Sequence, residues 1–94
     1  MDFLELFNEV TKVAKPVFAD ELKPITDPVT PFKETHVDSL DLLMVVIYMC
    51  EIYGISEEVG KNAKPTCVAE LQAFVEEHKT RDPESLQAAL EQIQ

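Results

Sequence analysis

The sequence predicts an all-α protein: a four-helix bundle with a long loop between its first two helices and an extra C-terminal helix. A chain rich in leucine, valine and glutamate and poor in glycine favours helices over sheets, and glycine occurs only twice in 94 residues. Apolar residues also recur at the spacing of one helix face along much of the chain. With 46% hydrophobic residues, the chain can form one domain with a modest packed core.

The N-terminal part is expected to form a helix followed by a long loop. Residues 2 to about 22 carry apolar side chains at helical spacing from Phe3 onward. Pro16 must either kink this helix or stop it before a short second turn. Three prolines exclude a regular helix from residues 23–37, which predicts an ordered loop. Three apolar side chains are expected to anchor that loop in the core: Ile25, Val29 and Phe32.

Residues 38–53 form the strongest predicted helix. Asp38 and Ser39 supply N-cap chemistry, and Asp41 adds negative charge to the first turn. Gly54 fits the left-handed position that follows a helix end. The interior is apolar on nearly all sides, so this helix is expected to be deeply buried or to meet a partner.

Two shorter helices are expected after Gly54. Ser56 can cap one helical turn over residues 56–62. Pro65 and Thr66 are expected to start a second helix that reaches about His78.

A final helix is expected within residues 81–94. Asp82 is its predicted cap, and Pro83 its first helical residue. Packing against the rest of the protein must hold so short a helix, because it would be marginal alone in water. Four residues are expected to form its apolar face: Leu86, Ala89, Leu90 and Ile93.

The formal net charge of −10 argues against several classes of partner. A surface this acidic repels phosphate backbones and anionic lipids, so we expect basic protein surfaces and neither nucleic acid nor membranes. The longest apolar run, Leu42 to Cys50, is about half of what a bilayer requires. Cys50 and Cys67 form no CxxC pair and indicate the reduced thiols of a cytoplasmic protein.

Metal binding and catalysis are not expected. The acidic stretches lack the spacing of a calcium-binding loop. A cysteine–histidine hydrolase needs an oxyanion hole and an orienting acid, which so small a bundle rarely provides. The potential zinc ligands match no familiar spacing: His36, Cys50, Cys67 and His78.

The motif Asp38-Ser39-Leu40-Asp41 opens the apolar helix. A serine in this position is held at a helix N-terminus with its hydroxyl toward solvent, where the helix dipole and free N–H groups favour a phosphate. A phosphodiester-linked group would therefore suit Ser39. On these four residues alone, a simple helix cap is the favoured interpretation, because serine and aspartate are the commonest caps.

The wider sequence resembles the acyl carrier proteins of fatty acid, polyketide and related pathways. In that family an Asp-Ser-Leu motif heads the second helix, often a few residues after a phenylalanine, and residues 29–41 read VTPFKETHVDSLD. Tyr53-Gly54-Ile55 matches the family's Phe-Gly-Ile. Residues 65–71 are similar to the family's Thr-Val-x-x-Leu opening of its last helix. The resemblance spans about residues 2–78.

The resemblance implies a carrier function for Ser39. This serine would bear 4'-phosphopantetheine, and acyl intermediates would be held as thioesters on the thiol of that arm. Asp38, Leu40 and Asp41 would help a phosphopantetheinyl transferase to recognise the site. The other expected partners are an acyl-loading enzyme or ligase, a ketosynthase and further enzymes of the pathway.

The resemblance also implies an organisation for the whole chain. Residues 1–80 would form the carrier domain, and residues 81–94 a helical extension of it. The chain would be a monomer and would catalyse no reaction itself. A peptidyl or aminoacyl carrier would share the fold and the arm, whereas an unmodified helical interaction module need not keep a serine at position 39.

Two departures from the family pattern favour a specialised pathway. Thr35 and His36 stand where the family usually has Leu-Gly, so His36 must take an unusual backbone angle or the loop must be reshaped. Apolar residues also replace common acidic ones on the second helix: Met44, Cys50 and Ile52.

The second helix is therefore expected to meet partners through apolar contacts. Leu40, Met44 and Tyr48 lie one turn apart from the start of the helix and are expected to be exposed. Asp41 and Glu51 are expected to orient the partner by their charge. Three other residues are expected to line the bundle interior, where the family can shelter an acyl chain: Leu43, Val46 and Ile47.

Overall fold

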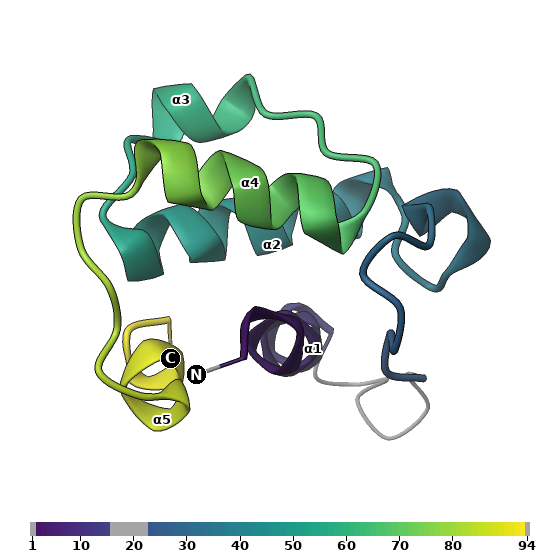
Figure 1. Cartoon of the computed structure of the whole chain (residues 1–94), viewed down its shortest axis with the longest axis horizontal. Coiled ribbons are helices and arrows are strands. Elements are labelled where there is room, and N and C mark those ends of the chain that lie inside the picture. The colour runs from purple at the N-terminus through teal and green to yellow at the C-terminus, as the bar shows by residue number, and fades with distance from the viewer. Residues whose placement is uncertain (1, 16–22, 94) are drawn as a thin grey trace.

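The structure is a computed structural model in which residues 2–15 and 23–93 are described. This part of the chain folds into helices joined by loops, which confirms the all-α prediction (Figure 1). The helices are α1 (Phe3–Ala14), α2 (Ser39–Tyr53), α3 (Glu57–Lys61), α4 (Val68–His78) and α5 (Leu86–Glu91), and a short 3₁₀ turn, η2, spans Phe32–Glu34.

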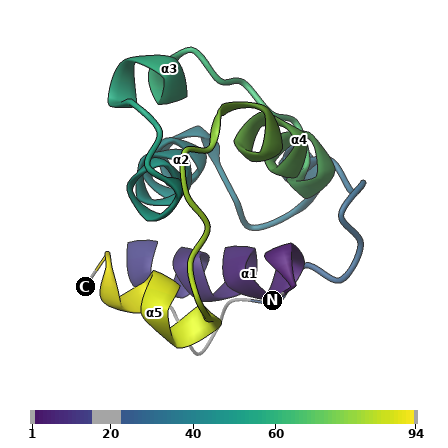
Figure 2. The same ribbon diagram turned by 60° about the vertical axis from the view of Figure 1, so that its left-hand side comes forward.

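Helix α2 packs against three other helices, which explains why its sequence is apolar on nearly all sides. Helix α4 runs beside α2, α1 crosses both at a steep angle, and α5 lies against α1 (Figures 1 and 2). Three helices supply most of the fully buried side chains: Leu6, Phe7 and Val10 from α1, Val45, Met49 and Ile52 from α2, and Val68, Leu71 and Val75 from α4.

Helix α1 ends at Ala14, directly before Lys15. The Lys15 backbone lies outside the helical region (φ −130°, ψ 65°), as expected for a residue that precedes a proline. Helix α1 therefore ends before Pro16, and whether helix resumes beyond it, as in a kinked helix, concerns residues outside the described ranges. The short second turn expected up to about residue 22 lies outside the described residues.

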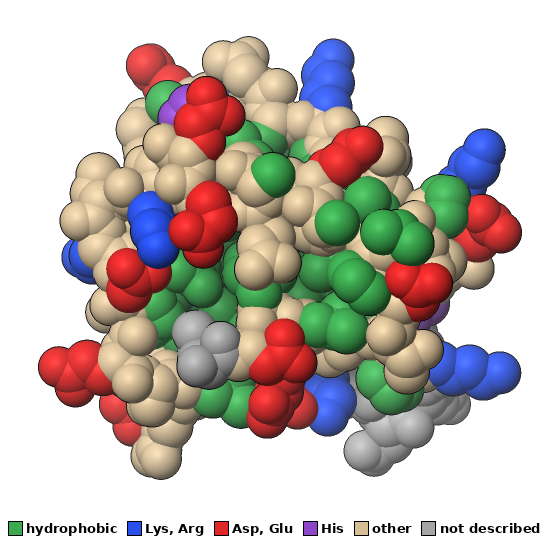
Figure 3. All heavy atoms as spheres, viewed as in Figure 1, with side chains coloured by type: hydrophobic (Ala, Val, Ile, Leu, Met, Phe, Trp, Pro, Cys, Tyr) green, Lys and Arg blue, Asp and Glu red, His purple; other side chains and the backbone are tan. Residues whose placement is uncertain are grey.

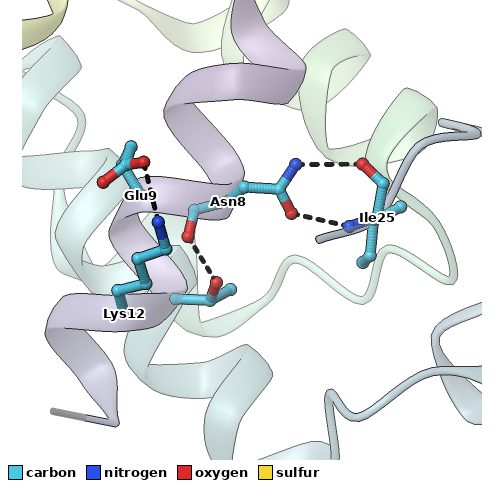
Figure 4. A network of polar contacts seen from close by, with 5 residues as sticks. Asn8, Glu9, Lys12 and Ile25 are labelled. Carbon is cyan, nitrogen blue, oxygen red and sulfur yellow. Dashed lines mark hydrogen bonds and ion pairs between the residues drawn. The ribbon is translucent and has the colours of Figure 1, made fainter. Parts of the chain in front are cut away.

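The loop of residues 23–37 is anchored in two of the three expected places. Ile25 and Phe32 are both buried. The side chain of Asn8 on α1 holds the backbone of Ile25 from both sides: its Nδ2 donates to the carbonyl at 2.9 Å, and its Oδ1 accepts from the N–H at 2.8 Å (Figure 4). One amide side chain thus fixes the path of the loop across α1.

The prediction that Val29 is a third anchor is wrong, because this side chain is 65% exposed. Asp27 Oδ1 accepts from the Val29 N–H at 3.1 Å, and the Asp27 carbonyl accepts from the Thr30 N–H at 3.2 Å. The Pro28 carbonyl also accepts from the Ala69 N–H at 2.9 Å. The backbone of this tight turn, and not the valine side chain, therefore attaches the loop to α4.

The predicted ends of α2 and start of α3 are confirmed. Asp38 is the N-cap of α2, and Gly54 follows its end in the left-handed conformation (φ 68°). Ser56 caps α3, because its hydroxyl accepts from the Glu58 N–H at 3.2 Å.

Helix α4 begins at Val68, so the prediction of a start at Pro65 and Thr66 is wrong. The Glu70 carboxylate accepts from both the N–H and the hydroxyl of Thr66, at 2.8 and 2.9 Å. Thr66 is thus held as part of the approach to the helix. These bonds lower the pKa of Glu70 below its ordinary value.

Helix α5 begins at Leu86, so the predicted roles of Asp82 and Pro83 at its start are wrong. Asp82 instead forms an ion pair with Lys79 at 2.9 Å. Ser85 is the N-cap, and its Oγ accepts from the Ala88 N–H at 3.1 Å. The predicted apolar face is confirmed: Ala89 is fully buried, and Leu86, Leu90 and Ile93 pack partly buried against the core.

Arg81 attaches the α5 segment to the end of α2. Its guanidinium donates to the carbonyl of Ile52 at 3.2 Å, and also to the carbonyl of Glu51. It donates further to the side chain of Gln92 at 3.0 Å. Because the last carbonyls of a helix lack partners within it, this cation both completes α2 and holds α5 beside it.

Helix α3 approaches α2 closely at a glycine. A Cβ atom placed on Gly60 would lie 2.5 Å from the Cys50 Sγ, and Cys50 is only 1% exposed.

We expect Gly60→Ala to lower the free energy of unfolding by about 1–2 kcal/mol, because overpacking costs about 1–3 kcal/mol and the better helix propensity of alanine offsets part of it. Urea unfolding monitored by circular dichroism measures this change.

The Cys50→Ala background provides the control for Gly60→Ala. Without the sulfur atom there is room for the new methyl group, so the destabilising effect of Gly60→Ala should disappear in this background. An equal loss in both backgrounds would show that Cys50 is not the contact that requires glycine.

Candidate functional site

Ser39 is the first residue of α2, and its side chain is exposed. Its hydroxyl forms no hydrogen bond within residues 2–15 and 23–93, in contrast to Ser56 and Ser85, whose hydroxyls cap α3 and α5. The capping interpretation of the motif therefore applies to Asp38 and not to Ser39. A serine with no capping role at an exposed helix start is free to accept a covalent group.

Two reciprocal hydrogen bonds fix the turn that presents Ser39. Asp38 Oδ1 accepts from the Asp41 N–H at 2.8 Å, and Asp41 Oδ2 accepts from the Asp38 N–H at 3.2 Å. The bond from the Asp41 N–H is the main reason that the pKa of Asp38 lies below its ordinary value. Asp38 therefore carries a full negative charge beside Ser39 at neutral pH.

The expectation that Asp41 offers a surface charge to partners is wrong. This residue is only 8% exposed, and its Oδ2 lies 2.6 Å from the Nζ of Lys15 at the end of α1. The hydrogen bond to Asp41 raises the pKa of Lys15, so Lys15 stays charged at neutral pH. Lys15 thus offsets the charge of Asp41 and ties the start of α2 to α1.

An apolar stripe runs outward along α2 from the residue after Ser39. Its members stand at i, i+3, i+4 and i+7, which is one face of a helix: Leu40, Leu43, Met44 and Ile47. Leu40 is 68% exposed, Leu43 is 44% exposed, and the other two are partly exposed. In Figure 2 no other helix lies over the outer side of α2, on the left of the view.

Several expectations about α2 need correction. Leu43 points outward and Ile47 is only half-buried, so of the three residues expected inside the bundle only Val46 is buried there, at 3% exposure. Tyr48 is also half-buried and packs against the core instead of standing free. Cys50 and Ile52, which stand where the family often has acidic residues, are each 1% exposed.

The reason for these errors is that periodicity carries no information in a helix that is apolar all round. Only the positions of α1, α3 and α4 decide which sides of α2 are covered. The exposed acidic side chain of Glu51 lies near the other end of α2 from Ser39, as expected.

A groove of about 600 Å³ lies beside Ser39, between the loop and the starts of α2 and α4. Its lining is mostly apolar and comprises Pro31, Phe32, Lys33, Val37, Asp38, Ser39, Leu42 and Thr66. Sequence reasoning missed Lys33 and Thr66 as members of the site. Thr66 lies 27 residues from Ser39 in sequence, so no local pattern could have indicated it.

The floor and walls of this groove are held by contacts from other elements. The rings of Phe32 and Phe7 stack with centroids 5.5 Å apart. The Phe32 N–H donates to the Thr66 carbonyl at 2.8 Å, which joins the loop to α4. The Thr35 hydroxyl accepts from the Val37 N–H at 3.1 Å, which fixes the last residues before the motif. The groove is therefore part of the folded framework.

The potential zinc ligands are not brought together. Cys50 lies at the α2–α3 contact, Cys67 caps α4, and His78 lies beside Phe74 at a ring distance of 4.8 Å. Both cysteines are buried and free of disulfides, and burial raises the pKa of Cys50. No group of three or more potential ligands occurs among the residues that the structure describes.

His36 does not take the left-handed angle that the missing glycine would have allowed. No residue other than Gly54 has a positive φ in the described ranges. The His36 Nδ1 is buried and has no hydrogen-bond partner among the described residues.

Comparison with known protein families, with curated proteins and with solved structures found no match to this chain. None of the helices in residues 2–15 and 23–93 has both the length and the apolar character needed to cross a membrane. On the face seen in Figure 3, acidic side chains are scattered and hydrophobic ones gather between them.

We expect the Asp38 cap to make the stability of the protein depend on pH. The pKa of Asp38 is lowered in the folded state, so its contribution is present above the unfolded value of about 3.8 and is lost as the pH falls through the folded value. The free energy of unfolding should therefore decrease more in the wild type than in Asp38→Asn between pH 6 and pH 2. Urea titrations across this range measure the difference.

Glu58→Gln is the matched control for Asp38→Asn, because Glu58 is also an exposed acid in the first turn of a helix. It should follow the wild-type pH dependence. Identical curves for the wild type and Asp38→Asn would contradict the assigned role of the Asp38 charge.

Proposed function

We propose that this protein is a non-catalytic acyl carrier that bears 4'-phosphopantetheine on Ser39. The observation that carries the proposal is the exposed Ser39 hydroxyl, which has no bond within the described residues and sits on a rigidly capped helix start. The sequence resemblance to acyl carrier proteins names the modification that such a serine would receive. When bound, the group supplies the thiol on which acyl intermediates are carried.

The residues around Ser39 fit a phosphodiester. The start of α2 directs the positive end of its dipole and its first N–H groups toward this position. Lys33 lines the adjoining groove and forms no ion pair with another described residue. The Asp38 charge opposes an anion here, but its carboxylate is already occupied in accepting from the Asp41 N–H. Lys15 offsets the charge of Asp41.

Ser39 also meets the needs of the transfer reaction. Its oxygen would displace 3',5'-adenosine bisphosphate from the pantetheine phosphate of coenzyme A, with its proton leaving to a base of the transferase. This step requires that a transferase reach the hydroxyl, and the exposed position of Ser39 supports such access. Leu40 stands beside it as an exposed apolar contact for that enzyme.

The apolar stripe of α2 is the proposed docking surface for the pathway enzymes. Leu40 and Leu43 would enter the centre of such an interface, where buried apolar contacts dominate affinity. Glu51 remains as an exposed acid on the same helix that can orient a basic partner. We place the protein in the cytoplasm, as a monomer that serves a transferase, an acyl-loading enzyme or ligase, and a ketosynthase.

Intact-mass measurement tests the modification. Incubation with coenzyme A, Mg²⁺ and a promiscuous phosphopantetheinyl transferase should add the mass of one arm, and Ser39→Ala should abolish the addition. Because the Ser39 hydroxyl has no structural bond in the described residues, Ser39→Ala should keep the circular dichroism spectrum and the unfolding midpoint of the wild type.

Ser56→Ala is the matched control, since it removes another exposed serine at a helix start. It should accept the arm as the wild type does. An unchanged mass of the wild type with several transferases would reject the carrier and favour an unmodified interaction module. A peptidyl or aminoacyl carrier would load equally, and its cargo would then be distinguished with acyl-loading and aminoacyl-loading enzymes.

Partner affinity tests the apolar docking surface. We expect Leu43→Glu to weaken binding of the loaded carrier to its ketosynthase or ligase by about tenfold or more, because the new carboxylate would be buried without a partner at the centre of an apolar interface. Binding of the wild type should change little between low and physiological salt. Calorimetry at two salt concentrations measures both effects.

Val29→Glu is the control for Leu43→Glu, because Val29 is equally apolar and more exposed but lies on the loop. It should leave the affinity unchanged. Wild-type affinity in Leu43→Glu, together with a steep salt dependence, would contradict apolar docking and indicate binding led by charge.

A further inference from the structure

We infer that the groove beside Ser39 is the resting site of the attached arm. Pro31 and Leu42 would contact the paired methyl groups of the pantetheine, and Lys33 would face the phosphodiester. This inference rests on the proposed function, because only a modified Ser39 bears the arm.

The groove is continuous with the attachment point. Ser39 is itself one of the residues that line it, so a group bonded to the Ser39 oxygen begins at the groove wall. The groove volume of about 600 Å³ falls within the range of small-molecule sites. A short arm bonded to Ser39 has a high effective concentration in the groove, because one of its ends is fixed at the groove wall. The covalent bond therefore makes the arm the expected occupant of the groove.

The chemistry of the lining matches the order of groups along the arm. The arm begins with an anionic phosphodiester and continues with a carbon that bears two methyl groups, followed by two amides and the thiol. The groove provides an exposed lysine, Lys33, and an apolar surface that includes Pro31 and Leu42, and the carboxylate of Asp38 also lines it. The opposite charge and the apolar contact are thus both present on one continuous surface.

On the far wall of the groove, the polar groups of Thr66 already have hydrogen-bond partners within the protein. The Thr66 N–H and hydroxyl both donate to Glu70, and its carbonyl accepts from the Phe32 N–H. A wall whose polar groups are already paired can be covered by apolar atoms without leaving those groups unsatisfied.

Two apolar surfaces flank Ser39, and they are of different shape. Leu40 and Leu43 stand out from α2 as exposed side chains, whereas Leu42 is partly buried against the core and lies in the hollow. A concave surface covers more of a flexible chain than a ridge does. With the arm in the groove, the stripe stays free for the partner enzyme, and a partner that uses the thiol must draw the arm out.

Nuclear magnetic resonance of the loaded protein tests the inference. Intact mass first establishes that one arm is present; if none is added, the proposed function fails before this question arises. In the loaded wild type we expect amide shifts at Thr66 and Lys33 relative to the unloaded protein, and nuclear Overhauser contacts from the arm methyl groups to Leu42 and Pro31. Thr66 is the sharpest reporter because it is remote from Ser39 in sequence.

The arm thiol provides a second readout. Charge reversal in Lys33→Glu should speed its alkylation by iodoacetamide about two- to fivefold, the range expected from losing one exposed charge contact. Lys61→Glu, an exposed lysine on α3, should not change the rate. Mass after digestion separates alkylation of the arm from that of Cys50 and Cys67.

Two results would overturn the inference in a protein proven to carry the arm. Shifts at Leu40 and Leu43 with none at Thr66 and Lys33 would place the arm along the stripe. Shifts confined to the neighbours of Ser39, with equal alkylation rates in the wild type and Lys33→Glu, would mean that the arm extends freely into solvent.

Discussion

The reciprocal hydrogen bonds between Asp38 and Asp41 are the constraint on which the site depends. They fix the residue at which α2 begins, and so they place Ser39 on the first turn with no capping duty of its own. Lys15 extends this constraint to α1 through its ion pair with Asp41. Because the Asp38 carboxylate caps the helix, the Ser39 hydroxyl has no capping role, and Ser39 is exposed.

Helix α2 combines two roles that usually require different sequences. Val45, Met49 and Ile52 fill the core between α1 and α4, while Leu40 and Leu43 face outward. An isolated helix with this sequence would have no preferred face. The surrounding helices choose its buried sides, and the remaining apolar side chains become a surface that a partner can cover.

The distribution of charge explains why an acidic protein can present an apolar site. Its formal net charge is −10, yet the acid nearest the motif interior, Asp41, is paired with Lys15. Lys33 adds a cation to the groove on the other side of Ser39. Lys15 and Lys33 thus place two positive charges near the start of α2, where the Asp38 carboxylate is the acid beside Ser39.

Local sequence determined the helices and several of their caps, because caps depend on hydrogen bonds within a few residues. The Asp38 cap, the left-handed Gly54 and the Ser56 cap could all be predicted in this way, as could the motif around Ser39. The caps of α4 and α5 could not, because Thr66 and Asp82 had alternative partners nearby and small energies separate such choices.

Tertiary structure alone decided which side of α2 is exposed and what lies beside Ser39. Leu43 and Cys50 are both apolar residues of one helix, and only the placement of α3 buries the second and leaves the first outside. Lys15 and Thr66 reach the site from distant parts of the chain. Contacts between residues far apart in sequence follow from how helices pack, and a single sequence carries no periodic signal for them.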